Sequence, residues 1–282
     1  MEFECFSDVG IGRESDEDAV VVVKLSAIFE SKPVEVGIFI VADGMGGAQA
    51  GEYASRICST YIISKIVHNL CNSDLSHDTM EEKIRKIIKE VNKIIMNEAK
   101  KKPAKYHGMG TTITMGIIFG GTLHCFNVGD SRAYVINETL NDIKQITKDH
   151  SVVQDLIDEG KISREDARGH PKSNIITRVL GHPSGMNVDY FHQNLYSDDI
   201  LLFCCDGLTD MVSDDIIKEI VLNKKESLKE IAKDLVNEAN VNGGADNISG
   251  ILVKPSQDLL SKHGIISDTV IKKHRKKMNM DV

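Results

Sequence analysis

The 282-residue sequence contains no tryptophan, and aromatic residues make up only 5% of it. Proteins that bind single-stranded nucleic acid stack bases on aromatic side chains, so this scarcity argues against such a function. Long apolar runs are also missing, because the longest, at 19–23, 36–42 and 200–205, are the length of a strand. None approaches the ~20 residues that a membrane-spanning helix needs. The sequence therefore predicts neither a nucleic-acid partner nor a membrane partner.

The sequence also lacks a secretory signal and the cysteine spacing of a zinc site or a disulfide framework. The N-terminus has no basic region followed by an apolar stretch, as a secretory signal would have. Six cysteines, at positions 5, 58, 71, 125, 204 and 205, form no Cys-x-x-Cys pair. Zinc sites and disulfide frameworks need better spacing than this. Reduced cysteines are typical of cytoplasmic proteins, and we expect this location.

Positive charge is in deficit, with 34 Lys and Arg against 42 Asp and Glu, a net charge of -8. Residues 254–282 carry +4, which leaves -12 for residues 1–253. An acidic body repels nucleic acids and anionic membranes. It can still act on phosphate esters where bound cations reverse the local field. We expect one domain over 1–254 and a basic tail over 255–282, which is either a docking element or a frayed end.

Apolar periodicity predicts runs of strands separated by pairs of helices. The predicted strands cover 2–9, 19–25, 34–41, 112–119, 123–128, 133–136, 143–147, 187–195, 199–204 and 248–253, and the predicted helices cover 51–70, 80–98, 149–159, 214–222 and 227–240. Gly120-Gly121 indicates a hairpin turn, and 101–105 a loop. Because strands and helices do not alternate regularly, an α+β sandwich is favoured over a doubly wound parallel sheet.

One segment, residues 148–181, is rich in glycine, proline, histidine and charge. A second short helix is expected to start in it near Ser163. We interpret the segment as a mobile excursion from the core.

Aspartates recur where predicted strands meet glycine or asparagine. They are Asp16 and Asp18 before one strand, Asp43 after another, Asp130 and Asp206 after two more, and Asp246 before the last. A single Asp-Gly is most often a turn, but such a crowd of carboxylates would repel itself without a compensating charge. Carboxylates and carbonyls are the ligands of Mg²⁺ and Mn²⁺, and no His or Cys cluster suggests zinc. The pattern makes a divalent-metal site a hypothesis beside the turn interpretation.

Six segments of the sequence, in order, resemble the protein phosphatase 2C family, the metal-dependent serine/threonine protein phosphatases, in its compact bacterial form. They are residues 12–18, 43–47, 108–112, 128–132, 206–210 and 246–249, and the match runs from Phe3 to Val253. The stretch 147–181 also resembles the flap segment of the family. Asp-Gly-x-Gly-Gly alone is moderately specific, whereas all six segments in order are very specific. The resemblance implies a four-layer αββα sandwich of two antiparallel β-sheets flanked by helix pairs.

The resemblance also implies roles for single residues. Asp43 would bridge two cations, Mn²⁺ or Mg²⁺, with the Gly44 carbonyl on one of them. The coordination would be completed by Asp18, Asp206 and Asp246, supported by Glu17 and Asn247, while Asp130 with Asp206 matches a third, weaker cation position. Arg13 matches the phosphate-binding arginine of the family, since its planar fork suits two phosphate oxygens.

The implied reaction is hydrolysis of phosphoserine and phosphothreonine. Two cations would lower the pKa of a bridging water, and the hydroxide would attack phosphorus in line while Arg13 stabilises the equatorial oxygens. Met45 stands where some members carry a histidine proposed as general acid, so we assign no general acid. His107, His124 and His150 are candidates by chemistry only.

Several alternatives stay open at this point. Asp16, often asparagine in bacterial members, either adds negative charge beside the metals or caps the turn. A catalytically weak member that binds phosphoproteins is a second function, although the intact Asp43, Asp206 and Asp246 argue against it. Another metal phosphohydrolase or a nuclease would act on polyanions, which the acidic body disfavours. The expected partners are phosphorylated proteins, substrates of a cognate serine/threonine kinase, and we expect a monomer.

Overall fold

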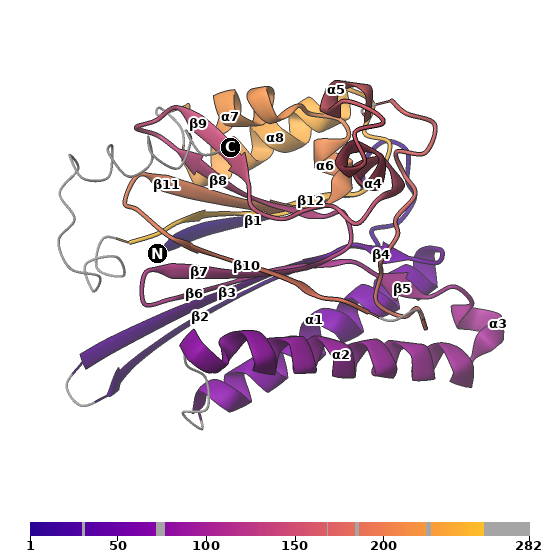
Figure 1. The fold of residues 1–282 in the computed structure, drawn as a ribbon, viewed down its shortest axis with the longest axis horizontal. Helices are drawn as coiled ribbons and strands as arrows, with labels where there is room; N and C mark the ends of the chain where they lie inside the picture. Colours follow the sequence, from indigo (N-terminus) through magenta and orange to yellow (C-terminus); the bar gives the residue numbers. More distant parts are fainter. Residues whose placement is uncertain (30–31, 72–76, 168, 184–185, 224–226, 257–282) are drawn as a thin grey trace.

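The structure, a computed structural model, describes residues 1–29, 32–71, 77–167, 169–183, 186–223 and 227–256. Two five-stranded antiparallel sheets pack face to face, and helices cover both outer faces (Figure 1). This arrangement confirms the predicted αββα sandwich. Most of the predicted tail, from residue 257 on, lies outside the described residues. No helix in the described part of the chain combines the length and the apolar content that crossing a membrane requires.

The first sheet joins the two ends of the described chain. Its strands lie in the order β1 (Glu2–Asp8), β12 (Ile248–Lys254), β11 (Asp199–Cys204), β8 (Arg132–Asn137) and β9 (Asp142–Gln145). The first strand pairs with the last from Glu2↔Lys254 to Asp8↔Ile248. Helices α7 (Asp214–Val221) and α8 (Leu228–Val241) pack on the outer face of this sheet through buried apolar side chains.

The second sheet carries the longest strands. Its order is β10 (Asp189–Asn194), β7 (Thr122–Val128), β6 (Ile113–Phe119), β3 (Lys32–Ala42) and β2 (Ala19–Phe29), and helices α1 (Ala48–Cys71) and α2 (His77–Lys101) cover it. Along β3 the side chains alternate, as a strand requires. Ile38 and Ile40 face the helices, whereas Phe39 and Val41 face the first sheet. Phe39 stacks on Phe203 of that sheet, with ring centroids 5.8 Å apart.

Several short elements differ from the expectation. The predicted loop at 101–105 is wrong in part, because Pro103–Tyr106 forms the helix α3, which begins with proline and is held by Tyr106 stacked on Tyr53. Two elements were not predicted: the single-turn helix α6 (Asp206–Thr209), and the pair β4 (Gly44–Met45) with β5 (Gly110–Thr111). The predicted Gly120-Gly121 turn is confirmed, with both φ angles positive, at 55° and 79°.

The segment 148–181 holds two short helices, α4 (Val152–Asp158) and α5 (Arg164–Ala167). Helix α4 begins three residues later than predicted, because Ser151 caps it by accepting from the Gln154 amide at 3.2 Å. The segment is anchored at both ends. The His150 amide donates to the Gly129 carbonyl at 2.9 Å, and Leu180 exchanges two backbone hydrogen bonds with Thr111. Its mobility stays a prediction.

Candidate active site

The strand registers bring the predicted aspartates to one end of the sandwich (Figure 1). Asp18 and Asp43 adjoin the paired residues Ala19 and Ala42 in the second sheet. In the first sheet β11 pairs with β8; Asp206 follows β11, and Asp130 precedes β8. Asp246 lies just before β12, the strand between β11 and β1. Both sheets therefore contribute carboxylates to a shared rim.

The backbone of Asp43 is held on both sides by two threonines. The Asp43 amide donates to Thr112 Oγ1 at 3.0 Å, and the Thr112 amide donates to the Asp43 carbonyl at 2.8 Å. The Thr111 hydroxyl donates to the same carbonyl at 2.9 Å. These hydrogen bonds and the adjoining β4–β5 pairing fix the backbone from which the Asp43 side chain projects.

Gly44 and Gly51 leave room for the residues around them. A Cβ atom at Gly44 would overlap the carbonyls of Gly51 and Glu17, and one at Gly51 would overlap the Glu17 carboxylate. The Glu17 amide donates to Asn247 Oδ1 at 2.9 Å, and Asn247 Nδ2 donates to the carbonyls of Val9 and Ser15 at 2.8 and 2.9 Å. Asn247 thus fastens the 9–17 loop to the start of β12.

The carboxyl group of Asp43 lies among other acids. Burial raises its pKa well above the ordinary value, and the charges of Asp206, Asp18 and Asp130 raise it further. Asp206 lies within hydrogen-bonding reach of it. Burial also raises the pKa of Asp206 to about 6. Ionising these groups together is unfavourable, because like charges repel strongly in a poorly hydrated place.

Asp18 is held from the first sheet, although it begins a strand of the second. The Ser249 hydroxyl donates to Asp18 Oδ2 at 2.6 Å. Burial raises the pKa of Asp18 to about 8 against the effect of that hydrogen bond, and the charge of Asp16 adds to the rise. Asp16 Oδ1 accepts from the Asp18 amide at 3.0 Å, while its other oxygen accepts from Ser7. Asp16 therefore both caps the turn and adds negative charge.

Two buried oxygens in this cluster have no hydrogen-bond partner in the described part of the chain: Asp130 Oδ1 and Asp206 Oδ1. A buried acceptor without a partner is costly in a folded protein. Together with the Gly44 backbone they form an all-oxygen donor set, which suits Mg²⁺ or Mn²⁺. The donors present fit such cations.

The side chains do not form a finished metal cage. Among the described residues, no three His, Cys, Asp or Glu side chains converge closely enough to hold a metal ion. Several of the carboxylates are instead turned to protein partners. Asp18 accepts from Ser249, and Asp246 Oδ2 accepts from Arg13 Nη2 at 2.6 Å. Cation binding by this cluster therefore requires these side chains to reorient.

Arg13 lies at the exposed edge of the cluster, with 47% of its side chain accessible. Its hydrogen bond to Asp246 raises the pKa of the guanidinium, with smaller contributions from Glu17 and Asp43. The structure thus brings Arg13 beside the predicted ligands. Among the described residues, the Arg13 side chain hydrogen-bonds to Asp246 alone, so the rest of its guanidinium is available to an anion.

The three candidate histidines have different surroundings. His124 is buried on β7, with Nδ1 2.7 Å from the Tyr190 hydroxyl. His150 is buried too; its Nδ1 accepts from the Gly129 amide at 3.0 Å, and burial lowers its pKa. His107 is exposed beside α3, and Met45 is 38% exposed at the turn after Asp43. His124 and His150 have structural contacts, and no general acid is assigned.

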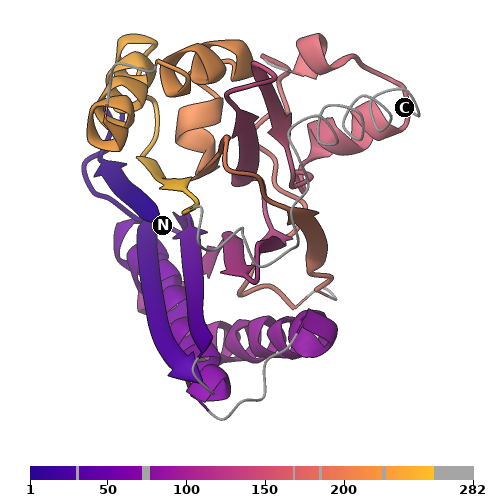
Figure 2. The same cartoon turned by 90° about the vertical axis from the view of Figure 1, so that its left-hand side faces the viewer.

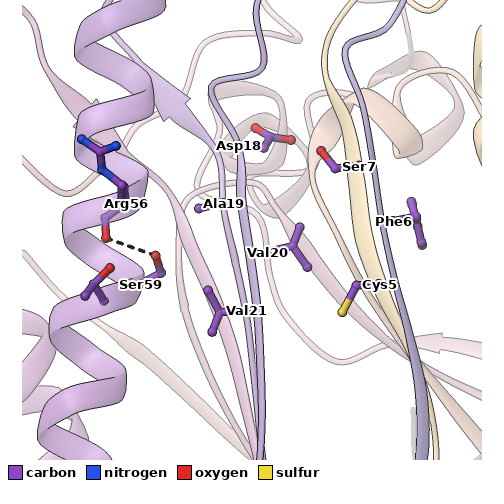
Figure 3. Close-up of a pocket in the computed structure, with 10 residues that line it drawn as sticks. Cys5, Phe6, Ser7, Asp18, Ala19, Val20, Val21, Arg56 and Ser59 are labelled. Carbon is purple, nitrogen blue, oxygen red and sulfur yellow. Dashed lines mark hydrogen bonds between the residues drawn. The ribbon is translucent and has the colours of Figure 1, made fainter.

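A groove of 560 Å³ lies between β1, β2 and α1 and reaches Asp18 from the side (Figure 3). Cys5, Ser7 and Val20 line it, with Arg56 on α1. Its lining includes none of the other predicted cation ligands. The groove is therefore separate from the rim where the aspartates gather.

Sequence reasoning missed three side chains that hold the ligands in place. Thr112 fixes the Asp43 backbone, and Ser249 fixes the Asp18 carboxylate. Cys205 Sγ accepts from the Ser249 amide and donates to the Asn247 carbonyl, both at 3.1 Å. Thr112 and Ser249 stand inside the recognised segments 108–112 and 246–249, which was the signal that could have identified them.

Comparison with known proteins agrees with this arrangement. The family model described as protein phosphatase 2C matches residues 27–215, and a second model of the same description matches 188–248. The serine/threonine phosphatase stp of Listeria monocytogenes serovar 1/2a is 38% identical over 262 residues, which cover 93% of this chain and 98% of that protein. These similarities extend over nearly the whole length of both proteins.

Solved structures give the same result. The crystal structure of the serine/threonine phosphatase Stp1 from Staphylococcus aureus matches with a TM-score of 0.77 and 33% identity, covering 90% of this chain and 95% of that one. The catalytic domain of the serine/threonine protein phosphatase PstP, solved in complex with two manganese ions, matches with a TM-score of 0.71 and 30% identity. That match covers 89% of this chain and 96% of the PstP chain.

Proposed function

Since this chain belongs to the protein phosphatase 2C family and is a metal-dependent serine/threonine phosphatase, we propose that the rim around Asp43 is its catalytic centre. The observation that carries this proposal is the buried, mutually repelling carboxylates, two of which have an oxygen without a partner. Phosphate-ester hydrolysis needs positive charge, and an acidic cluster supplies it only through bound cations.

The proposed ligands come from both sheets. Asp43 would bridge two cations, with the Gly44 carbonyl, Asp18, Asp206 and Asp246 completing their coordination, and Asp130 with Asp206 would hold a weaker third one. Bound Mn²⁺ or Mg²⁺ would supply Lewis acidity, which lowers the pKa of water and neutralises phosphate charge. Glu17 and Asn247 would support this set by holding the 9–17 loop and Gly44 in place.

The residues of the chain itself would bind and orient the phosphorylated side chain. Arg13 would direct its guanidinium at two phosphate oxygens, and the hydrogen bond that it now makes to Asp246 would be released when Asp246 turns to a cation. The arginine would also stabilise the charge that develops on the equatorial oxygens during in-line displacement. Exposed Met45 beside Asp43 would contact the protein substrate without transferring a proton.

The wider proposal concerns partners and organisation. The substrates would be phosphoproteins made by a cognate serine/threonine kinase in the cytoplasm, and the protein would act as a monomer. Residues 1–254 would form the catalytic domain, with 148–181 as a flap-like segment and 255–282 as a basic tail. No observation favours the alternative of a catalytically weak phosphoprotein-binding member.

Asp43 provides the decisive test. Hydrolysis of a phosphothreonine peptide is measured with Mn²⁺, with EDTA, and with the Asp43→Asn variant. We expect EDTA to abolish activity and Asp43→Asn to lower kcat/KM by about a thousandfold or more, because the bridging carboxylate is lost. Asp215→Asn, at an exposed aspartate on α7, serves as the matched control and should retain full activity. Hydrolysis that survives both EDTA and Asp43→Asn would show that the proposed centre is wrong.

A further inference from the structure

Helix α2 leads directly into α3 (Figures 1 and 2). Together the two helices expose a row of lysines, which we name the lysine ridge. It consists of Lys86, Lys89, Lys93, Lys100, Lys102 and Lys105, all exposed. The first four lie three, four and seven residues apart, which places them on one helical face. The opposite face of α2, with Ile84, Ile88 and Ile95, is fully buried in the core.

The charge of the ridge is not balanced locally. Residues 86–105 contain seven lysines and two glutamates, a charge of +5, which leaves -13 for the rest of the chain. Both glutamates have other partners: Glu90 accepts from the Tyr61 hydroxyl at 3.1 Å, and Glu98 accepts from Lys101 at 2.6 Å. Within the described residues, the six ridge lysines form no ion pair. Lys102 and Lys105 lie over the Tyr106 ring, 6.0 and 5.2 Å from its centroid, a contact that does not neutralise their charge. The charge of the ridge is therefore available to a partner.

The ridge ends at the proposed catalytic rim. From Lys86 to Lys100 it extends for about 21 Å, at 1.5 Å per helical residue. Helix α3 follows, and the next turn packs the Gly108 carbonyl directly against Gly46. Residues 110–111 then pair with Gly44 and Met45 as β5 and β4. A chain that lies along the ridge is thus led to the turn that carries Asp43.

The residue types exposed around the lysine ridge indicate which kind of partner could bind it. Between Lys86 and Lys105 the exposed positions are lysines, Asn97, Pro103 and Ala104, with no large apolar or aromatic side chain. Insertion into a bilayer needs such apolar groups, and base stacking needs aromatic ones. The acidic remainder also repels nucleic acids and anionic membranes. Lysines act as flexible point charges without fixed geometry, and a row of them suits an extended acidic peptide.

We propose that the lysine ridge is a docking surface for an acidic segment of the protein substrate. The segment would lie about ten residues from the phosphorylated residue, since an extended chain spans about 3.3 Å per residue. This inference rests on the proposed function for its link to catalysis, whereas the binding of an acidic segment can be measured without catalysis. Selection of substrates would then depend on charge far from the phosphate.

The test compares two pairs of exposed lysines, each four residues apart on a helix. K89Q/K93Q removes charge from the ridge, and K229Q/K233Q removes the same charge from α8, on the opposite side of the sandwich. The substrates are p-nitrophenyl phosphate and two phosphothreonine peptides, which carry six glutamates or six glutamines ten residues from the phosphate. We expect K89Q/K93Q to lower kcat/KM about three- to tenfold for the glutamate peptide alone. In 0.5 M NaCl this difference should disappear.

Equilibrium binding of the unphosphorylated glutamate peptide, followed by fluorescence anisotropy, separates the two proposals. If this peptide binds and K89Q/K93Q weakens it, the ridge is supported even if no substrate is hydrolysed, and only the proposed function fails. If hydrolysis is normal and K89Q/K93Q changes all substrates equally or none, the ridge proposal is wrong. Tighter binding of duplex DNA or of vesicles containing phosphatidylserine than of the glutamate peptide would also overturn it.

Discussion

Two groups of acidic side chains flank the turn between β7 and β8, and they differ in how their charge is balanced. In the first, the Asp149 carboxylate accepts three hydrogen bonds from Arg132, at 2.7 to 3.1 Å, and one from Gln145 at 2.8 Å. Arg132 also donates to the Tyr134 hydroxyl at 3.2 Å. Every charge in this network has a partner, so it needs nothing from outside the chain.

In the second group, around Asp43, burial and neighbouring negative charge raise the pKa values of the carboxylates. In the described part of the chain, Asp18, Asp43 and Asp206 form no ion pair with a basic side chain. Arg13 reaches the group only at the exposed edge. A folded protein that keeps such a group must balance its charge with bound protons or with a cationic ligand, because buried like charges are unfavourable. Near the rim, charged side chains that are paired with each other therefore have a structural role, whereas carboxylates without a basic partner indicate a binding site.

The largest effect on stability is expected from a substitution of Arg132. Replacing it with methionine leaves the buried Asp149 carboxylate without a charged partner, although the hydrogen bond from Gln145 remains. We expect the free energy of unfolding to fall by about 3 kcal/mol, toward the lower end for a buried pair because a quarter of the Arg132 side chain is exposed. Urea denaturation measures this loss. The double variant Arg132→Met/Asp149→Leu should recover part of this free energy. The fall in the free energy of unfolding should be the same with and without Mn²⁺, which distinguishes this network from the Asp43 group.

Metal addition should act on the Asp43 group alone. At a free Mn²⁺ concentration one hundred times the Kd, binding stabilises the folded state by about 2.7 kcal/mol. Thermal unfolding with Mn²⁺ and with EDTA measures the shift in Tm. We expect Asp43→Asn to remove most of this shift and Arg132→Met to retain it. An equal shift in the Asp43→Asn variant would mean that the cations bind elsewhere.

A smaller effect is expected on the pH dependence of the free energy of unfolding when EDTA is present. The folded-state pKa values of Asp206 and Asp18, about 6 and about 8, lie above the ordinary value of 3.8. Groups whose pKa is raised by folding stabilise the protein below pH 4, and this contribution is lost as the pH rises through 6 and toward 8. We expect a loss on the order of 2 kcal/mol, since both side chains stay partly exposed. Urea midpoints from pH 4 to 8 measure it, and Asp206→Asn should flatten the profile.

Much of the fold followed from local pattern. The core strands and the two long helices carry regular apolar periods, and the observed elements lie within a few residues of the predicted ones. Helices α3 and α6 have only four residues each, too few for a period, so tertiary contacts such as the stacking of Tyr106 on Tyr53 determine them. The pairing of β1 with β12 joins distant parts of the sequence, and no local pattern predicts it.

The candidate site was predictable in position but not in detail. Aspartates at strand ends could be listed because strand ends and glycine turns are local signals. The contacts of Asp18 with Ser249 and of Arg13 with Asp246 join residues more than 200 positions apart, and they depend on side-chain directions that no pattern encodes. For the same reason, the two roles of Asp16 became clear only from its contacts in the structure.

The pairing of β1 with β12 also bears on synthesis of the protein. Strand β12 lies between β1 and β11, so the first sheet stays open until residues 248–254 have emerged from the ribosome. Asp246 and Asn247 come just before that strand, and domains fold as units during translation. A nascent chain that lacks them has neither a closed sheet nor a complete rim. If Asp246 is a cation ligand as proposed, the order of synthesis would keep the chain inactive until almost all of residues 1–254 have been made.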